Sequence, residues 1–176
     1  DHECVVLFQN GEQNAFAELV RRYQNRVFRF LVRMTGGREA AMELTQDTMI
    51  KALHALAGWR PDATFATWLF RIANNAALDR LRRRKVVKYV PIDEHMDFPD
   101  PADGPEEALH TAQRYRVLDA ALQRLQEDYR QVLLLREVEE MSYAEIGEVL
   151  GLREGTVKSR IARARQALLE VCKGRL

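Results

Sequence analysis

Apolar residues recur at helical spacing along most of the chain. Within residues 12–34 an apolar residue falls at every third or fourth position, which places one continuous stripe on one face of a helix. No segment alternates convincingly between apolar and polar residues, so we expect no sheet. The helical pattern predicts further helices over residues 3–9, 38–57, 107–125 and 127–138, and in a long segment that follows Thr64.

The segment from Ser142 to Leu169, SYAEIGEVLGLREGTVKSRIARARQALL, has the features of a helix-turn-helix. Ser142 and Glu145 form a capping box at the start of the first helix, and Gly151 ends that helix in a left-handed turn. Gly147 is expected where the two helices cross, because only a small residue lets their backbones approach. Such a unit lays its second helix in the major groove of DNA. The alternative is a basic amphipathic hairpin that only packs, with its charges in solvent.

Charge is nearly balanced over the chain but unevenly distributed. The formal net charge is +1, yet residues 89–107 are acidic and contain several prolines, which predicts a flexible, extended linker. Basic residues gather in the second helix of the helix-turn-helix and in the run from Arg80 to Lys85. We therefore expect an all-α protein with two small helical domains, residues 1–88 and 108–176, joined by a flexible acidic linker, with the helix-turn-helix in the second domain.

The segment TFATWLFRIANNAALDRLRRRK combines an aromatic start, two adjacent amides and a basic end. Aromatic side chains can stack on the bases of a single strand, and the amides Asn74 and Asn75 can hydrogen-bond exposed base edges. The alternative is that Phe65, Trp68 and Phe70 are ordinary core residues. For Phe65 and Trp68, which lie on the apolar stripe, that alternative is at least as strong as a direct base contact.

Catalytic chemistry has no candidate residues in the sequence. A glycine-rich phosphate loop, a His/Cys set with metal-ligand spacing and a nucleophile motif are all absent, so we expect no enzyme, no cofactor and no metal. No apolar run approaches the roughly 20 residues that span a bilayer. The only cysteines, Cys4 and Cys172, fit a reducing cytoplasm better than a disulfide scaffold. Two basic helical surfaces remain, and they indicate a nucleic-acid ligand.

Four segments follow one another in an order typical of one family: AFAELVRRYQNRVFRFLVRMTG, AMELTQDTMIKALHAL, FATWLFRIANNAALDRLRRRK and SYAEIGEVLGLREGTVKSRIARAR. They resemble, in turn, the first conserved helix, the clamp-binding helix, the minus-ten melting segment and the minus-thirty-five helix-turn-helix of the bacterial extracytoplasmic-function sigma factors. These are two-domain promoter-recognition subunits of RNA polymerase in the sigma-70 superfamily. The sequence departs from their pattern with Met49 for an aromatic residue, Gln126 for a proline and Arg153 for a small helix cap.

The resemblance implies three sets of functional residues. The set that contacts the clamp helices of core polymerase is Glu43, Gln46, Asp47 and Lys51. The set for the minus-ten element is Arg60, Asp62, Thr64, Trp68, Asn74, Asn75, Arg80, Arg82 and Arg83. The set for the minus-thirty-five element is Arg153, Gly155, Thr156, Lys158, Ser159, Arg160 and Arg163, in which the backbone N–H groups near Gly155 and Thr156 form a phosphate site at a helix N-terminus.

The implied function is that of an alternative sigma factor, which binds the β′ clamp and β subunits of core RNA polymerase and directs promoter-specific initiation on promoter DNA. We also expect an anti-sigma factor as a partner, and a cytoplasmic protein without membrane insertion of its own that this partner holds at the inner membrane. The acidic linker is expected either to thread through a nucleic-acid-lined channel of polymerase or to act as a plain spacer. The alternative function is a stand-alone helix-turn-helix regulator whose N-terminal helical domain senses a signal or dimerises.

Overall fold

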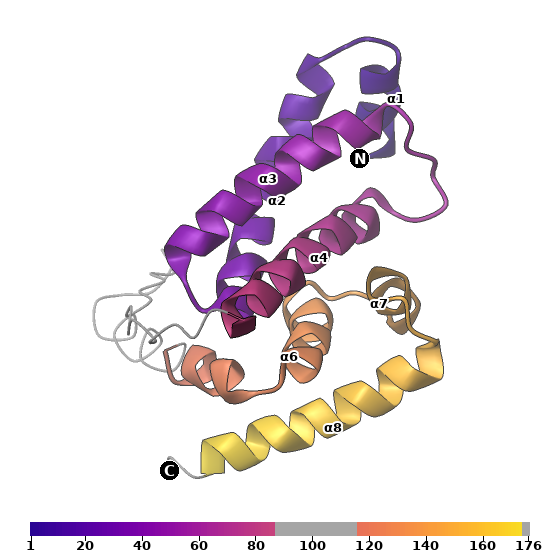
Figure 1. Ribbon diagram of the computed structural model, residues 1–176. Coiled ribbons are helices and arrows are strands. Elements are labelled where there is room, and N and C mark those ends of the chain that lie inside the picture. Colours follow the sequence, from indigo (N-terminus) through magenta and orange to yellow (C-terminus); the bar gives the residue numbers. More distant parts are fainter. Residues whose placement is uncertain (87–115, 174–176) are drawn as a thin grey trace, which may run out of the picture.

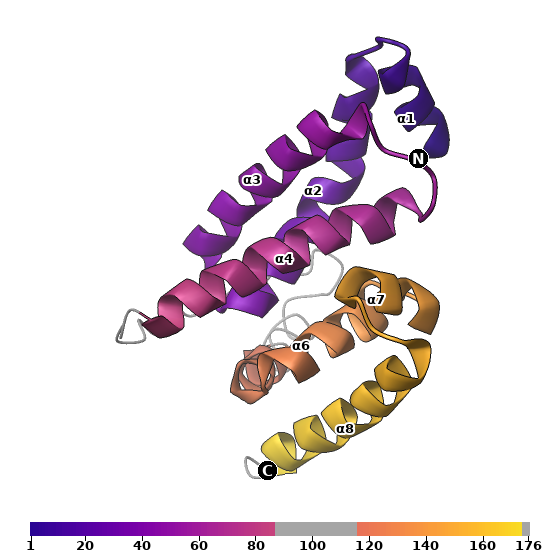
Figure 2. The same ribbon diagram turned by 45° about the vertical axis from the view of Figure 1, so that its right-hand side comes forward.

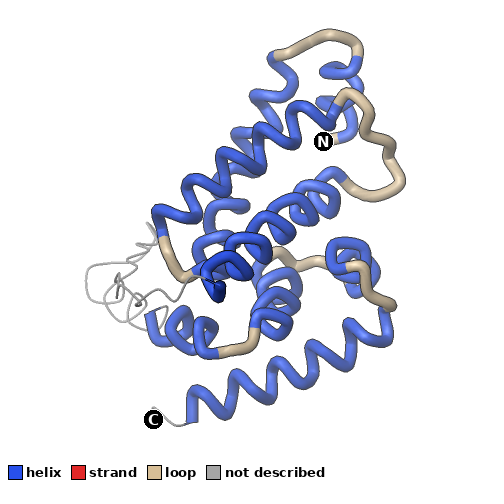
Figure 3. The backbone as a smooth tube through the Cα atoms, viewed as in Figure 1, coloured by secondary structure: helices blue, strands red, loops and turns tan. Residues whose placement is uncertain are grey.

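The computed structural model describes residues 1–86 and 116–173, and every regular element in these ranges is helical (Figure 1, Figure 3). The first helical unit comprises α1 (His2–Gln9), α2 (Asn14–Thr35), α3 (Arg38–Leu56) and α4 (Phe65–Val86). The second comprises the helical residues 116–124, α6 (Glu127–Leu133), the π-helix η1 (Leu134–Val138), α7 (Tyr143–Leu150) and α8 (Glu154–Lys173). The predicted all-α fold is confirmed, and the predicted linker, residues 89–107, lies outside the described residues.

Helix α2 is the centre of the first unit, where it packs against α1, α3 and α4. Two aromatic pairs join α2 to α4: Phe30 meets Phe70 edge to face with ring centroids 5.4 Å apart, and Tyr23 meets Phe65 at 5.3 Å. Such pairs stabilise the fold by about 0.5–1.5 kcal/mol beyond the contribution from burial of the rings. Phe65 and Phe70 are therefore core residues. The apolar stripe predicted within residues 12–34 is the buried face of α2, which contains Leu19, Tyr23, Val27, Leu31 and Met34.

The predicted helix boundaries in the first unit have local causes. Thr64 caps α4, because its Oγ1 accepts a hydrogen bond from the Thr67 N–H at 3.1 Å. Gly36 ends α2 with φ of 75°, a left-handed conformation that costs glycine nothing, and its N–H donates to the Val32 carbonyl. The chain then turns directly into α3.

The helix-turn-helix forms as its sequence predicts. The Ser142 Oγ accepts from the Glu145 N–H at 3.2 Å, and the Glu145 carboxylate accepts from the Ser142 N–H at 2.8 Å, which completes the capping box. Gly151 follows α7 with φ of 66°. A Cβ on Gly147 would lie 2.7 Å from the Leu152 carbonyl oxygen, so the close approach that requires glycine here is real.

The helix predicted over residues 127–138 is not a uniform α-helix. Its second part is the π-helix η1, after which the Glu139 N–H donates to the Leu134 carbonyl five residues earlier at 3.1 Å. A π turn accommodates an extra residue within the helical run. Glu140 then adopts φ of 56°, a left-handed conformation that is unfavourable for residues with a Cβ. No periodicity in the sequence marks this change.

The two helical units are in direct contact. Helix α7 packs against α4, and α6 packs against α2, while α8 lies on the far side of α6 from the first unit (Figure 2). Buried residues from both units form one continuous hydrophobic cluster. Sequence periodicity predicts the helices but contains no information on this arrangement.

Polar contacts between the units centre on the last turn of α2. A helix ends with carbonyls that lack intrahelical partners. Here the Gln123 Nε2 donates to the Arg33 carbonyl at 2.6 Å and the Arg130 Nη1 donates to the Met34 carbonyl at 2.5 Å. Gly36 makes room for this contact, because a Cβ at that position would lie 2.7 Å from the Gln123 Oε1.

Two ion pairs also cross from α2 to the second unit. The Arg33 Nε lies 3.0 Å from the Asp119 Oδ1, and the Arg26 Nη2 lies 2.9 Å from the Glu139 Oε2. Only 4% and 3% of the Asp119 and Glu139 side chains remain exposed. Burial raises the pKa of both carboxyl groups, and the facing arginines offset only part of that effect. Loss of the arginine from such a pair leaves a buried carboxylate without compensation, which costs about 3–5 kcal/mol.

Replacement of Gly147 by alanine tests the helix crossing. The new Cβ would meet a backbone carbonyl that cannot rotate away, so Gly147→Ala should lower the free energy of unfolding by about 1–3 kcal/mol. Gly155→Ala is the matched control, because a Cβ there meets nothing within 4 Å. Urea unfolding followed by circular dichroism measures both, and equal midpoints for the two variants would contradict the assignment.

Candidate nucleic-acid and partner interfaces

The loop between α3 and α4 places predicted minus-ten residues beside a pair of tryptophans. Arg60, Asp62 and Thr64 are all exposed on this loop. Trp68, on the first turn of α4, is half-buried, and its ring lies 6.3 Å from that of Trp59. Trp59 is also half-buried, so part of each ring remains accessible for stacking with a base. Trp59 is not among the residues predicted from the sequence, although its position next to a predicted loop is a usable signal.

Gln9, the last residue of α1, fixes the start of this loop. Its Nε2 donates to the Leu56 carbonyl at 3.1 Å and to the Trp59 carbonyl at 2.9 Å. These carbonyls belong to the end of α3 and the beginning of the loop, so Gln9 ties both to α1. Sequence periodicity could not reveal the contact, because the partners lie 47 and 50 residues apart.

The two adjacent asparagines of α4 lie in different environments. Asn75 is exposed, whereas only 1% of Asn74 is exposed and its Oδ1 has no hydrogen-bond partner among the described residues. Successive helical residues point about 100° apart. Because α4 packs against α2 and α3 and also against α7, its buried face is wide enough to include Asn74. Asn74 is therefore not accessible to DNA in this arrangement of the helices.

The C-terminal end of α4 presents a solvated basic surface. Arg80, Arg82 and Arg83 are exposed, as predicted for residues that hold a DNA backbone. Arg80 lies 3.5 Å from Glu43 of α3, and Arg82 lies 3.4 Å from Asp79. Exposed pairs of this kind contribute about 0–1 kcal/mol, so phosphate can replace the carboxylates at little cost.

The outer face of α3 carries the predicted polymerase-binding residues, and all of them are exposed: Glu43, Gln46, Asp47 and Lys51. The same helix exposes three large apolar side chains, which we call the α3 apolar stripe: Met42, Ile50 and Leu53, at 51%, 52% and 37%. Exposed apolar residues that are rimmed by charges are typical of protein interfaces. The stripe is not among the features predicted from the sequence, although its residues fall outside the buried positions of the same helix.

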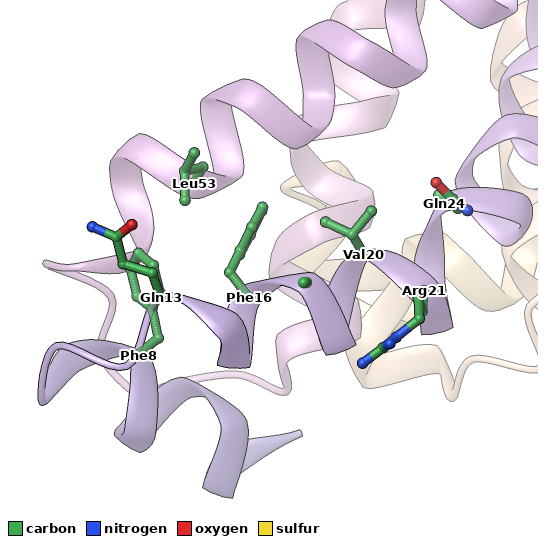
Figure 4. A pocket seen from close by; sticks show the side chains of 8 residues that line it. Phe8, Gln13, Phe16, Val20, Arg21, Gln24 and Leu53 are labelled. Atoms are coloured by element: carbon green, nitrogen blue, oxygen red, sulfur yellow. The ribbon is translucent and has the colours of Figure 1, made fainter.

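An open groove of about 700 Å³ continues the α3 apolar stripe toward α1 and α2 (Figure 4). Phe8, Phe16, Val20 and Leu53 contribute its apolar wall. In Figure 4 the Phe16 side chain extends from α2 toward Leu53 of α3. The stripe and the groove together form one apolar surface on the first unit.

Helix α8 separates an apolar face from a basic face. Val157, Ile161 and Ala164 are buried. Arg160 is only partly exposed, and its Nη1 lies 3.3 Å from the Asp128 Oδ2 of α6. The remaining predicted DNA-binding residues are exposed: Arg153, Gly155, Thr156, Lys158, Ser159 and Arg163.

Two contacts modify the predicted phosphate site at the start of α8. The Thr156 N–H, which the sequence analysis assigned to phosphate, donates to the Arg153 carbonyl at 2.9 Å. The Lys158 Nζ lies 3.0 Å from the Glu154 Oε1 and 5.5 Å from the centre of the Tyr143 ring. A cation over an aromatic ring is attracted by its negative face, which helps to orient Lys158. This contact of Tyr143 with the recognition helix is not among the features predicted from the sequence.

Residues 1–86 and 116–173 contain no group of three His, Cys, Asp or Glu side chains that could hold a metal ion. In the same ranges, none of the helices combines the length and apolarity that crossing a membrane requires. The described surfaces thus consist of two basic helical faces and one apolar face with a charged rim.

Two family models match this chain in order. The model for sigma-70 region 2 matches residues 19–86, and the model for sigma-70 region 4 matches residues 115–168. The first match covers α3 and α4 with most of α2, and the second covers the helix-turn-helix. Their order defines a sigma-70 type of transcription initiation factor, a class that does not consist of enzymes.

Individual relatives identify the family within the sigma-70 class. The chain is 39% identical to the ECF RNA polymerase sigma factor SigE of Mycolicibacterium smegmatis, over 93% of this chain and 65% of SigE. It is 33% identical to the ECF RNA polymerase sigma factor SigW of Bacillus subtilis, over 91% of this chain and 90% of SigW. The chain therefore belongs to the ECF RNA polymerase sigma factors.

A solved structure has a similar fold over nearly the whole length of this chain. CnrH, in complex with the cytosolic domain of CnrY, superposes with a TM-score of 0.74 at 28% identity, covering 99% of this chain and 97% of CnrH. Membership of the ECF family does not favour the alternative of a stand-alone regulator, because both sigma regions are present and in order.

Replacement of Gln9 tests its role in positioning the loop. Gln9→Ala removes two hydrogen bonds, each worth about 0.5–1.5 kcal/mol, so amides of residues 57–64 should exchange with deuterium faster than in the wild type. Gln13→Ala, at an exposed position close by, should leave these rates unchanged. Hydrogen exchange measured by mass spectrometry separates the two variants, and identical protection of the loop would show that Gln9 does not hold it.

Proposed function

We propose that the α3 apolar stripe and its charged rim form the surface that binds the clamp of core RNA polymerase. Protein interfaces combine an apolar centre with a polar periphery. Met42, Ile50 and Leu53 form the apolar centre, and the exposed Glu43 and Asp47 belong to the polar periphery. This combination on one helix is the observation that favours polymerase over DNA as the ligand of α3.

We propose that promoter DNA binds at two separate places. The loop between α3 and α4, with Trp59, Trp68 and the exposed Asn75, holds bases of the minus-ten element, and the basic end of α4 holds the adjacent backbone. The exposed basic face of α8 enters the major groove of the minus-thirty-five element, with Lys158 and Arg163 as its main contacts.

We also propose an anti-sigma factor as the regulator. Its target is the apolar surface of the first unit, since a protein that covers the α3 apolar stripe blocks access to polymerase. CnrH, which has the same fold, was solved with the cytosolic domain of CnrY as its partner. The chain works where polymerase is found, in the cytoplasm, and a regulator anchored in the inner membrane would hold it there.

The observation that carries the proposed function is the presence of two DNA-binding faces, on α4 and α8, together with one protein-binding face on α3. A sigma factor requires all three surfaces, because it must bind polymerase while it contacts two promoter elements. Runoff transcription with core polymerase on a library of promoters tests the proposal. We expect transcripts only from a subset with defined minus-ten and minus-thirty-five sequences, and a complete lack of transcripts would refute it.

Substitutions on α3 test the polymerase surface. Asp47→Arg combined with Lys51→Glu, and separately Ile50→Ser, should weaken binding to core polymerase about tenfold or more, as the loss of an interface hot spot does. Stability should change by less than about 0.5 kcal/mol, because these side chains are exposed. Glu12→Arg, an exposed position away from α3, is the control. Affinity measured by fluorescence anisotropy that is equal for all variants would show that polymerase binds elsewhere.

A forked template tests the minus-ten assignment. Opening a base pair and extruding its base costs a few kcal/mol, so the chain with core polymerase should prefer a forked minus-ten template over the same sequence as duplex. Asn75→Ala should reduce the preference for the correct base, whereas Asn25→Ala, exposed on α2, should not. Equal affinity for forked and paired templates, with no base preference to lose, would contradict the assignment.

A further inference from the structure

The end of α3 and the loop that follows it share one hydrogen-bond network with α1. The Gln9 amide donates to the Leu56 carbonyl at 3.1 Å and to the Trp59 carbonyl at 2.9 Å. A primary amide has two N–H groups, so these two contacts use both of them. The Leu56 carbonyl also accepts from the Trp59 N–H at 3.2 Å. One side chain of α1 therefore fixes the last turn of α3 and the first residue of the loop together.

Gln9 is itself attached to a rigid part of the first unit. The preceding residue, Phe8, places its ring 5.8 Å from that of Phe16 on α2. Val5, one turn earlier in α1, is completely buried. The end of α1 is thus fixed to α2 by packing, and the Gln9 amide has a defined position relative to the core. A side chain that positions another group does so most accurately from a rigid element.

The two rings of the tryptophan pair are positioned by different means. Trp68 on α4 packs against Phe65, with ring centroids 5.6 Å apart, and Phe65 is a core residue. Trp59 lies on the loop, where Gln9 binds its backbone carbonyl. The rings lie 6.3 Å apart and are inclined by 60°. The angle between their accessible faces therefore depends on the core at Trp68 and on Gln9 at Trp59.

We infer that Gln9 is a positioning residue for the minus-ten element, and that it sets the base preference of the loop by fixing Trp59 against Trp68. This inference rests on the proposed function of the loop. Gln9 acts through the backbone of Trp59 and not by contact with DNA. Helix α1 lies outside residues 19–86, which match sigma-70 region 2, so reading of the minus-ten element also depends on a helix that precedes this region.

Two substitutions separate the hydrogen bonds of Gln9 from the bulk of its side chain. Gln9→Met keeps a side chain of similar length and removes both donors, whereas Gln9→Lys keeps donors at the end of a flexible side chain. Gln13→Met, at the exposed N-cap position of α2, is the matched control. Far-ultraviolet circular dichroism checks that each variant keeps its helix content. A role of Gln9 in stability alone would change the unfolding midpoint and leave the two measurements below unchanged.

Tryptophan spectroscopy on the full-length chain tests the positioning of Trp59. The chain contains two tryptophans, and both belong to this pair, so no other indole contributes to the near-ultraviolet circular dichroism. Gln9→Met should change the tryptophan bands, whereas Gln9→Lys and Gln13→Met should keep the wild-type bands. Unchanged bands in Gln9→Met would overturn the inference, because Trp59 would then keep its place without the hydrogen bonds.

Base discrimination tests the consequence for function. Affinities of the chain with core polymerase are measured on forked templates that carry the correct or a wrong base at each unpaired minus-ten position. The ratio of the two affinities cancels the general effect of the added charge in Gln9→Lys. Gln9→Met should lower this ratio about threefold or more, as expected for the loss of two hydrogen bonds that order the loop, and Gln9→Lys should restore most of it. Gln13→Met should keep the wild-type ratio.

The wild-type measurement separates failure of this inference from failure of the proposed function. A wild-type chain that discriminates between bases, with an equal ratio in Gln9→Met, would refute the positioning role of Gln9 and leave the minus-ten assignment intact. A wild-type chain without any base preference on the forked templates would refute the proposed function of the loop, and the role of Gln9 in reading with it.

Discussion

The guanidinium of Arg130 donates hydrogen bonds to terminal carbonyls of two helices, one in each half of the molecule. The contact between the two halves depends on these hydrogen bonds. It donates to the Met34 carbonyl at the end of α2 and to the carbonyls of Leu122, Gln123 and Leu125 at the end of the helical residues 116–124. The terminal carbonyls carry the negative end of each helix dipole, so a cation is the right group for both. Because Arg130 is itself buried, loss of these acceptors would leave a charge without solvent or partners.

Helix α4 shows how one element can serve the core and a ligand together. Its Phe65 and Phe70 pack on α2, its buried face also meets α7, and only a narrow strip with Asn75 and the basic C-terminal end remains in solvent. The rigid core therefore fixes the direction of the solvent-facing strip. The loop before α4 is held in a similar way, because Gln9 binds its first carbonyls. Residues proposed to bind bases are thus attached to rigid supports.

The cationic residues proposed to bind DNA are held by weak contacts. Arg80 pairs with Glu43, Lys158 with Glu154 and Arg160 with Asp128, and at least one partner in each pair is exposed. Exposed ion pairs add little stability, so they orient the side chains without competing strongly against phosphate. The buried pairs of Arg26 and Arg33 are different, because water cannot replace their partners while the units are docked. The exposure of the carboxylate partner therefore separates cations available to a ligand from those committed to the fold.

The sequence by itself determined most of the helices, the capping box at Ser142, the glycines at Gly147 and Gly151 and the family, because these depend on neighbouring residues or on ordered motifs. Only the tertiary structure decided that Asn74 is buried while Asn75 is exposed, that Gln9 holds the loop after α3, and that the α3 apolar stripe has no cover in the described chain. It also decided how the two units meet. The physical reason is that periodicity fixes which face of a helix is apolar, whereas the partner of each face depends on groups far apart in the sequence.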